Sequence, residues 1–280
     1  MYKHFYVSDI PKADGKMVPA DAVDLLDPRT FGVIEITGLY RPTADDYITD
    51  LGGIDASVYG WMSVKSRTIT LNLDAQNDME RMRLYRVLPY GKTRRFWIET
   101  NAGTFWVDGY VTGMPEGSDN NDLIANFDVT IKCPYPWFRS MELHEVEMDS
   151  GVATTVQQAG DIPSGFQVYA ITQSASWGIN GYTIKDSSGN AFAWVPGSSA
   201  TVQRNPVGYV VKLVDTTPGI TEWHIPPGHD MTEQQYLATL EISGLPAISS
   251  DSDAEQITVT VSGMGTYTVR IAYYDTYSGV

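Results

Sequence analysis

Apolar and polar residues alternate along most of this chain, a pattern that indicates strands with one buried face. In one such run the apolar positions are Ile69, Leu71 and Leu73, with threonine and asparagine between them. Further alternating runs lie at residues 95–99, 127–132, 257–261 and 267–273. Turn-forming residues at 101–103 and 186–190 separate neighbouring runs, as in antiparallel hairpins. The pattern predicts a mainly β protein.

One segment, from Asp74 to Leu88, breaks the alternation. Apolar side chains recur there with a spacing of three, at Met79, Met82, Tyr85 and Leu88. An aspartate near its start can accept from free N–H groups, and the Pro-Tyr-Gly sequence at 89–91 ends it. We predict one substantial helix, laid across a sheet. Thr232 resembles a helix cap, but residues 236–242 alternate, so we predict a strand there.

Near mid-chain, a predicted strand runs into the sequence Cys133-Pro134-Tyr135-Pro136-Trp137-Phe138. Each proline fixes φ at about −65° and removes a backbone donor, so the strand cannot continue its ladder. The aromatic residues supply apolar surface where regular structure ends, and the single cysteine is predicted to be a small buried hydrophobe. We therefore predict a packed domain boundary, with one β domain at 1–138, a linker at 139–149 and a second β domain at 150–280.

The net charge of −15 is unevenly distributed. Residues 1–138 contain 14 Lys/Arg and 19 Asp/Glu, whereas residues 139–280 contain 5 and 15. A nucleic-acid-binding protein has a net basic footprint, which this chain lacks. The basic residues of the first domain cluster at Lys65, Arg67, Arg81, Arg83, Arg86, Lys92, Arg94 and Arg95.

Two interpretations of this cluster stay open. It is either a solvated face with local ion pairs, such as Glu80 with Arg83, or a patch that docks on an acidic neighbour, including another copy of the chain. The second interpretation makes six residues candidates for an interface between subunits: Arg81, Arg83, Arg86, Lys92, Arg94 and Arg95.

Signatures of catalysis and of metal binding are absent or incomplete. The chain has no nucleophile elbow, dinucleotide-binding glycine motif or P-loop. His224 and His229 lie in a proline-rich loop and would need two further ligands to hold a metal. Asp74, Gln76 and Asp78 have the spacing of a calcium loop, but Met79 occupies the position that requires glycine. We predict no enzymatic activity, no metal site and no cofactor.

Aromatic residues of the second domain are the remaining candidates for binding. Tryptophan and tyrosine can stack on sugar rings, but they are also common in cores and at subunit contacts. The candidates for glycan stacking are Trp177, Trp194 and Trp223, together with Tyr182 and Tyr209.

The order and spacing of several segments resemble the siphophage distal tail protein family. In the first domain the resemblance is carried by Arg67–Leu73, Arg83–Lys92, Arg94–Ile98, Val107–Val111 and Val129–Phe138. In the second domain it is weaker and rests on Ala159–Phe166 and Tyr273–Val280. It covers residues 60–138 well and the remainder in patches, and residues 1–59 do not match readily.

The resemblance implies an N-terminal β-sandwich or barrel with one helix that shares its fold with tail-tube proteins, followed by a galectin-like β-sandwich. It implies a ring, commonly a hexamer, at the distal end of a phage tail, assembled in the bacterial host cytoplasm. The implied partners are further copies of the chain, the major tail-tube protein, the tail-tip hub and a receptor-binding protein. DNA would pass through the lumen without specific binding, because basic walls would retain phosphates.

Two further functions are weighed against this structural role. The first is a carbohydrate-binding tail component that contacts the host surface through the second domain, and the second is a cell-wall hydrolase, which the lack of a catalytic site disfavours. No apolar run reaches the length of a membrane span, so we expect no membrane insertion.

Overall fold

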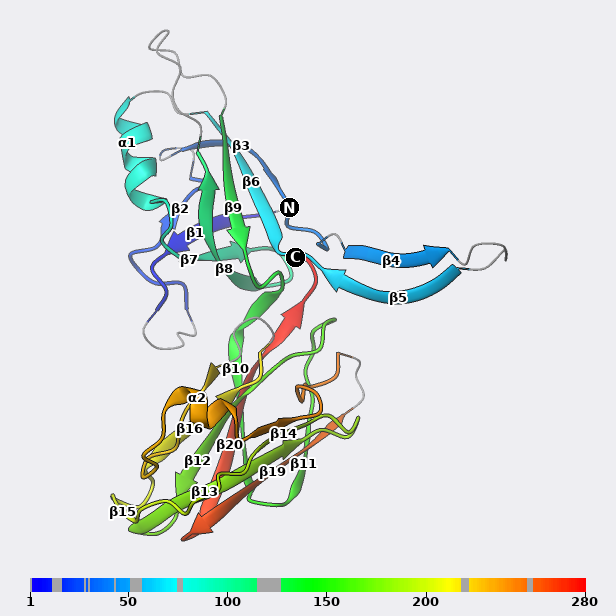
Figure 1. Cartoon of the computed structure of the whole chain (residues 1–280). Coiled ribbons are helices and arrows are strands. Elements are labelled where there is room, and N and C mark those ends of the chain that lie inside the picture. Colours follow the sequence, from blue (N-terminus) through cyan, green and yellow to red (C-terminus); the bar gives the residue numbers. More distant parts are fainter. Residues whose placement is uncertain are drawn as a thin grey trace. The chain divides into compact units, whose positions relative to one another are not determined.

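The computed structural model describes residues 2–11, 17–27, 29, 31–42, 44–50, 57–74, 78–114, 127–217, 222–250 and 254–280. The chain divides into two compact units (Figure 1). Unit 1 comprises Met1–Met141 and Tyr277–Val280, and unit 2 comprises Glu142–Thr276. The chain passes from one unit to the other within strand β10 (Phe138–Asp149) and returns at the end of strand β20 (Tyr267–Tyr277). Residues 139–149, predicted as a linker, therefore lie within a strand.

Unit 1 consists of antiparallel strands and one helix. Its elements are β1 (His4–Ser8), β2 (Val23–Asp24), β3 (Gly32–Thr37), β4 (Ala44–Asp50), β5 (Ser57–Val64), β6 (Arg67–Asp74), α1 (Asp78–Val87), β7 (Arg94–Glu99), β8 (Thr104–Gly113) and β9 (Phe127–Cys133). One group of strands has the order β2-β1-β7-β8, and a second has the order β3-β6-β9 and joins the far half of β8. Strands β4 and β5 form a separate two-stranded sheet.

The core of unit 1 follows the alternation in the sequence. Ile69, Leu71 and Leu73 of β6 are buried, as predicted, and so are Val129 and Ile131 of the neighbouring strand β9. Period-two alternation therefore identifies the buried face of this sheet.

Helix α1 lies within the predicted segment but packs through a different set of side chains. Leu84 and Leu88 are buried in the core, whereas three members of the predicted three-residue series, Met79, Met82 and Tyr85, are exposed. A packing face in an α-helix needs spacings of three and four, and a spacing of three alone drifts around the helix.

Unit 2 is a sandwich of two antiparallel sheets with one core. Its elements after β10 are β11 (Ala153–Val156), β12 (Gln167–Thr172), β13 (Ser176–Lys185), β14 (Ala191–Trp194), β15 (Gln203–Arg204), β16 (Val210–Asp215), β17 (Glu222–Trp223), α2 (Glu233–Leu237), β18 (Leu240–Ile242), β19 (Glu255–Met264) and β20. One sheet has the order β17-β16-β12-β20-β10 and the other β11-β19-β13-β14-β18, with β15 on β13. Apolar residues of both sheets form a single cluster. The predicted mainly β fold is confirmed.

The strand predicted at residues 236–242 is partly wrong. Residues Glu233–Leu237 form helix α2, and only Leu240–Ile242 form a strand. Thr232 and Gln235 make a capping box, in which each side chain bonds to the other's backbone N–H. These bonds satisfy free donors at the helix start and outweigh the short alternation that follows.

Candidate functional site

A buried arginine links distant segments of unit 1. Arg67, the first residue of β6, is 2% exposed. Its guanidinium donates to four carbonyl oxygens: Pro136 O at 2.6 Å, Gly38 O at 2.6 Å, Tyr40 O at 2.5 Å and Ser278 O at 2.5 Å. The planar head group carries five donors in a fixed geometry, which suits several acceptors at once. Arg67 therefore reaches segments that lie up to 211 residues away from it in the sequence.

The surroundings of Arg67 are apolar as well as polar. The ring of Phe138 lies with its centroid 4.3 Å from the guanidinium carbon, a cation–π contact. Burial lowers the pKa of Arg67 to about 10, which still leaves the side chain charged at neutral pH. Its four hydrogen bonds all involve backbone carbonyls, so partial charges rather than a carboxylate stabilise this cation.

Gly38 is required for one of these bonds. Its φ is +83°, and a Cβ atom there would lie 2.0 Å from the carbonyl oxygen of Thr68. Glycine adopts this left-handed conformation without steric cost and lets the two backbones approach closely. The carbonyl of Gly38, the residue that follows the neighbouring strand β3, can then reach Arg67.

The six-residue exit from β9 is packed unevenly. The side chains of Cys133, Tyr135, Pro136 and Phe138 are buried, Trp137 is half-buried and Pro134 is exposed. Burial raises the pKa of the Cys133 thiol to about 12, although the nearby Arg67 charge acts in the opposite direction. The thiol is therefore protonated and unreactive in folded unit 1.

A second cluster covers the other face of β7, where alternation predicts solvent exposure. Arg95 forms a two-pronged ion pair with Asp108, at 2.8 and 3.0 Å, and its guanidinium carbon lies 3.6 Å from the ring centroid of Trp106. Trp97 is fully buried and donates to Ser8 Oγ at 3.0 Å. This layer of aromatic and basic side chains explains why β7 is buried on both faces.

The six candidate interface residues have different environments. Arg83 and Arg86 are exposed on α1, and the described part of the chain does not include the side chain of Arg81. Lys92 is exposed and bonds Asp9 at 2.7 Å, and the half-buried Arg94 bonds the same carboxylate.

Arg95 is 6% exposed, so its prediction as an interface residue is wrong. The pair with Asp108 and the ring of Trp106 enclose it within its own chain.

The prediction that Trp177 and Trp194 stack on glycans is also wrong, because both side chains are fully buried. Trp194 donates to Thr239 Oγ1 and packs edge-on against His229, and Trp177 stacks on Tyr209. Neither ring can offer a face to a sugar. The side chain of Trp223 falls outside the described part of the chain.

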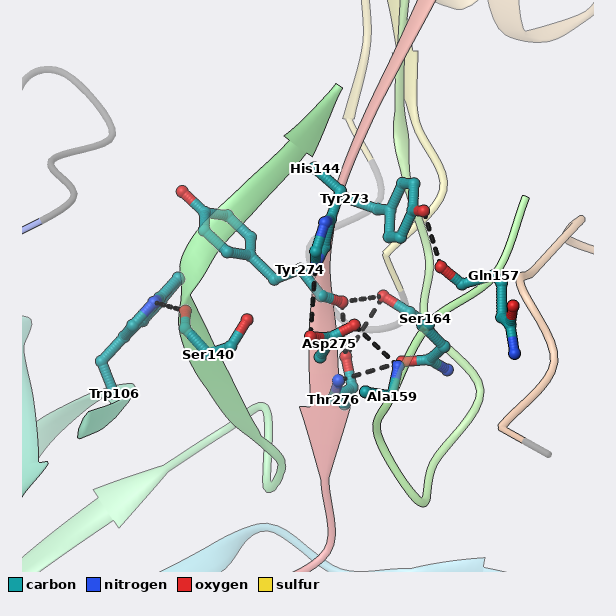
Figure 2. A network of polar contacts seen from close by, with 11 residues as sticks. Trp106, Ser140, His144, Gln157, Ala159, Ser164, Tyr273, Tyr274, Asp275 and Thr276 are labelled. Carbon is teal, nitrogen blue, oxygen red and sulfur yellow. Dashed lines mark hydrogen bonds and ion pairs between the residues drawn. The ribbon is translucent and has the colours of Figure 1, made fainter. Parts of the chain in front are cut away.

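The strands that cross between the units carry a polar network in unit 2 (Figure 2). Asp275 of β20 is 7% exposed and accepts from Ala159 N at 2.9 Å, while its other oxygen lies 3.1 Å from Nε2 of His144 on β10. The next residue, Thr276, donates its N–H to Gln158 Oε1 at 3.0 Å and its hydroxyl to Ser164 Oγ at 3.2 Å. The network fixes the end of β20 against two other segments of unit 2.

This network has no catalytic geometry. Ser164 donates to the carbonyl oxygens of Gly165 and Tyr274, not to His144, so the His–Asp pair does not activate this serine as a nucleophile. In the described ranges, no three His, Cys, Asp or Glu side chains form a group that could hold a metal ion. Over the same residues, no helix is long and apolar enough to cross a membrane.

Sequence reasoning missed the roles of Arg67 and Asp275, although a signal for both is present. Arg67 stands two residues before Ile69, and Asp275 two residues after Tyr273, so each continues the apolar face of its strand. A charged residue at a core position is a candidate for a buried, fully bonded group.

Comparisons with known proteins place this geometry in a known fold. No family model and no curated protein matches the sequence. Among solved structures, the chain matches the crystal structure of the SPP1 Dit protein (gp 19.1), described as a paradigm of the hub adsorption apparatus in phages that infect Gram-positive bacteria. The TM-score is 0.59 at 13% identity, over 98% of this chain and 99% of that chain. This chain has the Dit fold.

A second match is to a chain of the phage p2 baseplate in its activated conformation with Sr. The TM-score is 0.50 at 10% identity, and the match covers 99% of both chains. Both matches extend over unit 1 and unit 2, so the two-unit architecture as a whole, rather than one β-sandwich, is shared with the Dit fold.

Proposed function

We propose that this protein is a siphophage distal tail protein that forms a ring, a hexamer, between the tail tube and the tail-tip hub. The observation that carries the proposal is the likeness to SPP1 Dit over nearly the full length of both chains. That protein belongs to a hub adsorption apparatus. At this sequence identity the likeness concerns the fold, so the proposed function needs support from the residues of this chain.

The β4–β5 hairpin supports association between copies. Its two strands pair with each other and, in the described part of the chain, with no further strand. An isolated two-stranded hairpin is only marginally stable in water. A surface of a neighbouring subunit that covers or extends this sheet would stabilise it.

The environment of the basic cluster supports a lumen that does not retain DNA. Lys92 and Arg94 bond Asp9, Arg95 bonds Asp108, and Arg67 is buried. These four cations are neutralised or enclosed within their own chain and offer little attraction to phosphates. With a net charge of −15, the protein would let DNA slide past without binding it.

The further partners follow from the same proposal. The ring would contact the major tail-tube protein on one side and the tail-tip hub on the other, with unit 2 as a galectin-like platform for a receptor-binding protein. The protein would be a non-enzymatic component of the virion tail, assembled in the host cytoplasm. The alternative of direct glycan binding loses its main support, since Trp177 and Trp194 are buried.

The proposal is tested by imaging and weighing the purified protein. At micromolar concentration we expect rings with a central hole in negative-stain micrographs. Mass photometry should give about six times the 30.9 kDa of one chain. A monomer under these conditions would contradict the proposal.

The exposed arginines of α1 provide a test of the interface. The double variant Arg83→Glu, Arg86→Glu should shift the rings toward monomers, because a basic patch that meets an acidic neighbour would then repel it. Arg204→Glu is the matched control, an exposed arginine of unit 2. If both variants form rings as well as the original protein, α1 is not part of the interface.

A further inference from the structure

The segment Tyr277–Val280 follows unit 2 in the sequence but belongs to unit 1. The ring of Tyr277 packs edge-on against Phe105, with centroids 5.1 Å apart. The N–H of Val280 donates to Leu39 O at 3.2 Å, and Tyr2 donates its hydroxyl to Val280 O at 3.2 Å. Tyr277 and Val280 both contact the apolar core cluster of unit 1.

Arg67 ties this segment to the interior of unit 1. Ser278, itself buried, supplies one of the four carbonyl oxygens that accept from the guanidinium. Without the segment, the buried cation would lose an acceptor, and leaving a buried charged donor without its partner is costly. Unit 1 is therefore incomplete without residues that are translated after unit 2.

The residues just before this segment are anchored in unit 2. Asp275 accepts from Ala159 N and contacts His144, and Thr276 bonds Gln158 and Ser164 (Figure 2). The two sets of anchors are thus separated by a single peptide bond, between Thr276 and Tyr277.

Chain entropy favours folding of unit 2 before Tyr277–Val280 docks on unit 1. While unit 2 is unfolded, residues 142–276 form a long flexible loop between the two parts of unit 1. Closing a loop costs entropy that grows with its length. Once β10 and β20 pair in unit 2, with the Arg270–Glu145 ion pair and the His144–Asp275 contact across them, that loop is already closed. Docking of Tyr277–Val280 then costs little.

We propose that Tyr277–Val280 is a clasp that completes unit 1 only after unit 2 has folded. In a ring-forming protein this would keep incomplete chains from assembling through unit 1, a consequence that rests on the proposed function. The coupling of the two units does not rest on it.

The clasp is tested in the full chain with Gly279→Val. A Cβ at Gly279 would lie 3.1 Å from Arg41 N and 3.2 Å from the carbonyl carbon of Tyr40, so valine would press the segment against the backbone of residues 40 and 41 and loosen its docking. The matched control is Gly197→Val in unit 2, where a Cβ meets no atom within 4 Å. A chain that ends at Thr276 removes the clasp entirely.

Two readouts separate the units. Labelling of Cys133 by a thiol reagent reports opening of unit 1, since this single cysteine is fully buried there. Hydrogen exchange in β13 and β19 reports opening of unit 2. We expect both clasp variants to label Cys133 roughly tenfold faster or more, as for the loss of a buried hydrogen bond to a charged donor. Exchange in β13 and β19 should not change, and Gly197→Val should leave the labelling rate as it is.

Pulse-labelling during refolding tests the order directly. We expect the amides of β13 and β19 to gain protection before those of β6 and β9. Protection of β6 and β9 first, unchanged labelling of Cys133 in the chain that ends at Thr276, or equal loosening of both units would each overturn the clasp. These readouts concern single chains, so a failure to form rings would refute the proposed function and leave the result on the clasp intact.

Discussion

Unit 1 and unit 2 each contain a buried charge at the end of an alternating strand, but they stabilise it differently. Arg67 in unit 1 is held by carbonyl oxygens from four residues of three separate segments. Asp275 in unit 2 accepts from one backbone N–H and contacts the half-buried His144. The arginine gathers acceptors from three segments, whereas the aspartate joins β20 to one backbone N–H and to a single side chain on the neighbouring strand β10.

The difference indicates what each unit loses when its charge is removed. Four carbonyls surround Arg67, and without it each must find another donor inside a closed core. Asp275 lies nearer to solvent, beside a histidine that is half-buried, so water can replace part of what it provides. We therefore expect unit 1 to depend on its buried charge more strongly than unit 2 does.

The largest expected effect is that of Arg67→Met. The substitution keeps apolar bulk near Phe138 but takes the guanidinium donor away from four carbonyls, and it should lower the free energy of unfolding of unit 1 by about 3 kcal/mol. Hydrogen exchange in β6 and β9 measures this loss, with β13 and β19 as the internal reference.

Arg67→Lys and Lys132→Met are its controls. Lysine has three donors on a single nitrogen, so it can reach fewer of the four carbonyls. The free energy of unfolding of unit 1 in Arg67→Lys should therefore lie between those of the original protein and Arg67→Met. Lys132 is exposed on β9, and its replacement should leave the exchange of unit 1 unchanged. If Arg67→Met is no more harmful than Lys132→Met, the carbonyl cluster does not stabilise unit 1.

The sequence predicts those features of the fold that depend on local patterns, and not those that depend on contacts between distant segments. Period-two alternation is a local signal and locates the buried faces of β6, β9, β19 and β20 correctly. It cannot locate the second layer over β7, because Arg95 and Trp97 are covered by Asp108, Trp106 and other residues outside their own strand.

The same limit applies to the candidate sites. The burial of Trp177 and Trp194 depends on how two sheets pack, which no spacing in the sequence reveals. The contact between Arg67 and Ser278 spans 211 residues, so only the tertiary structure brings the two together. Alternation does place Arg67 and Asp275 on the buried faces of their strands. The sequence does not reveal the hydrogen-bond partners that stabilise these buried charges.

Asp275→Asn should have a smaller effect. Asparagine can still accept from Ala159 N but replaces the carboxylate beside His144 with a neutral amide, so unit 2 should lose about 1 to 2 kcal/mol. Exchange should increase in β20 and β12, while β6 and β9 serve as the reference. Glu241→Gln, at an exposed position of β18, is the matched control. A loss of stability as large as that of Arg67→Met would show that the two units depend equally on their buried charges, contrary to the expected difference.

The smallest expected effect is a difference in the alkaline stability of the two units. Burial raises the pKa of Cys133 from 9.0 to about 12 and that of Tyr236 from 10.0 to about 12. Between these values the unfolded chain has lost a proton that the folded unit keeps, so stability falls as pH rises. Unit 1 should begin to weaken above pH 9 and unit 2 only above pH 10.

Cys133→Ala isolates the contribution of the thiol. The difference in unfolding free energy between the original protein and this variant should shrink by about 1 kcal/mol from pH 8 to pH 10. Urea titration measures this difference in unfolding free energy. The unfolding transition of unit 1 is recognised as the one that shifts in Arg67→Met. Tyr182→Phe, which alters the buried hydroxyl pair with Tyr236, should show less than half of this change over the same range, because the unfolded tyrosine ionises only near pH 10. An equal difference at both pH values would mean that the Arg67 charge offsets the effect of burial on the pKa of Cys133. Burial would then not be the main determinant of that pKa.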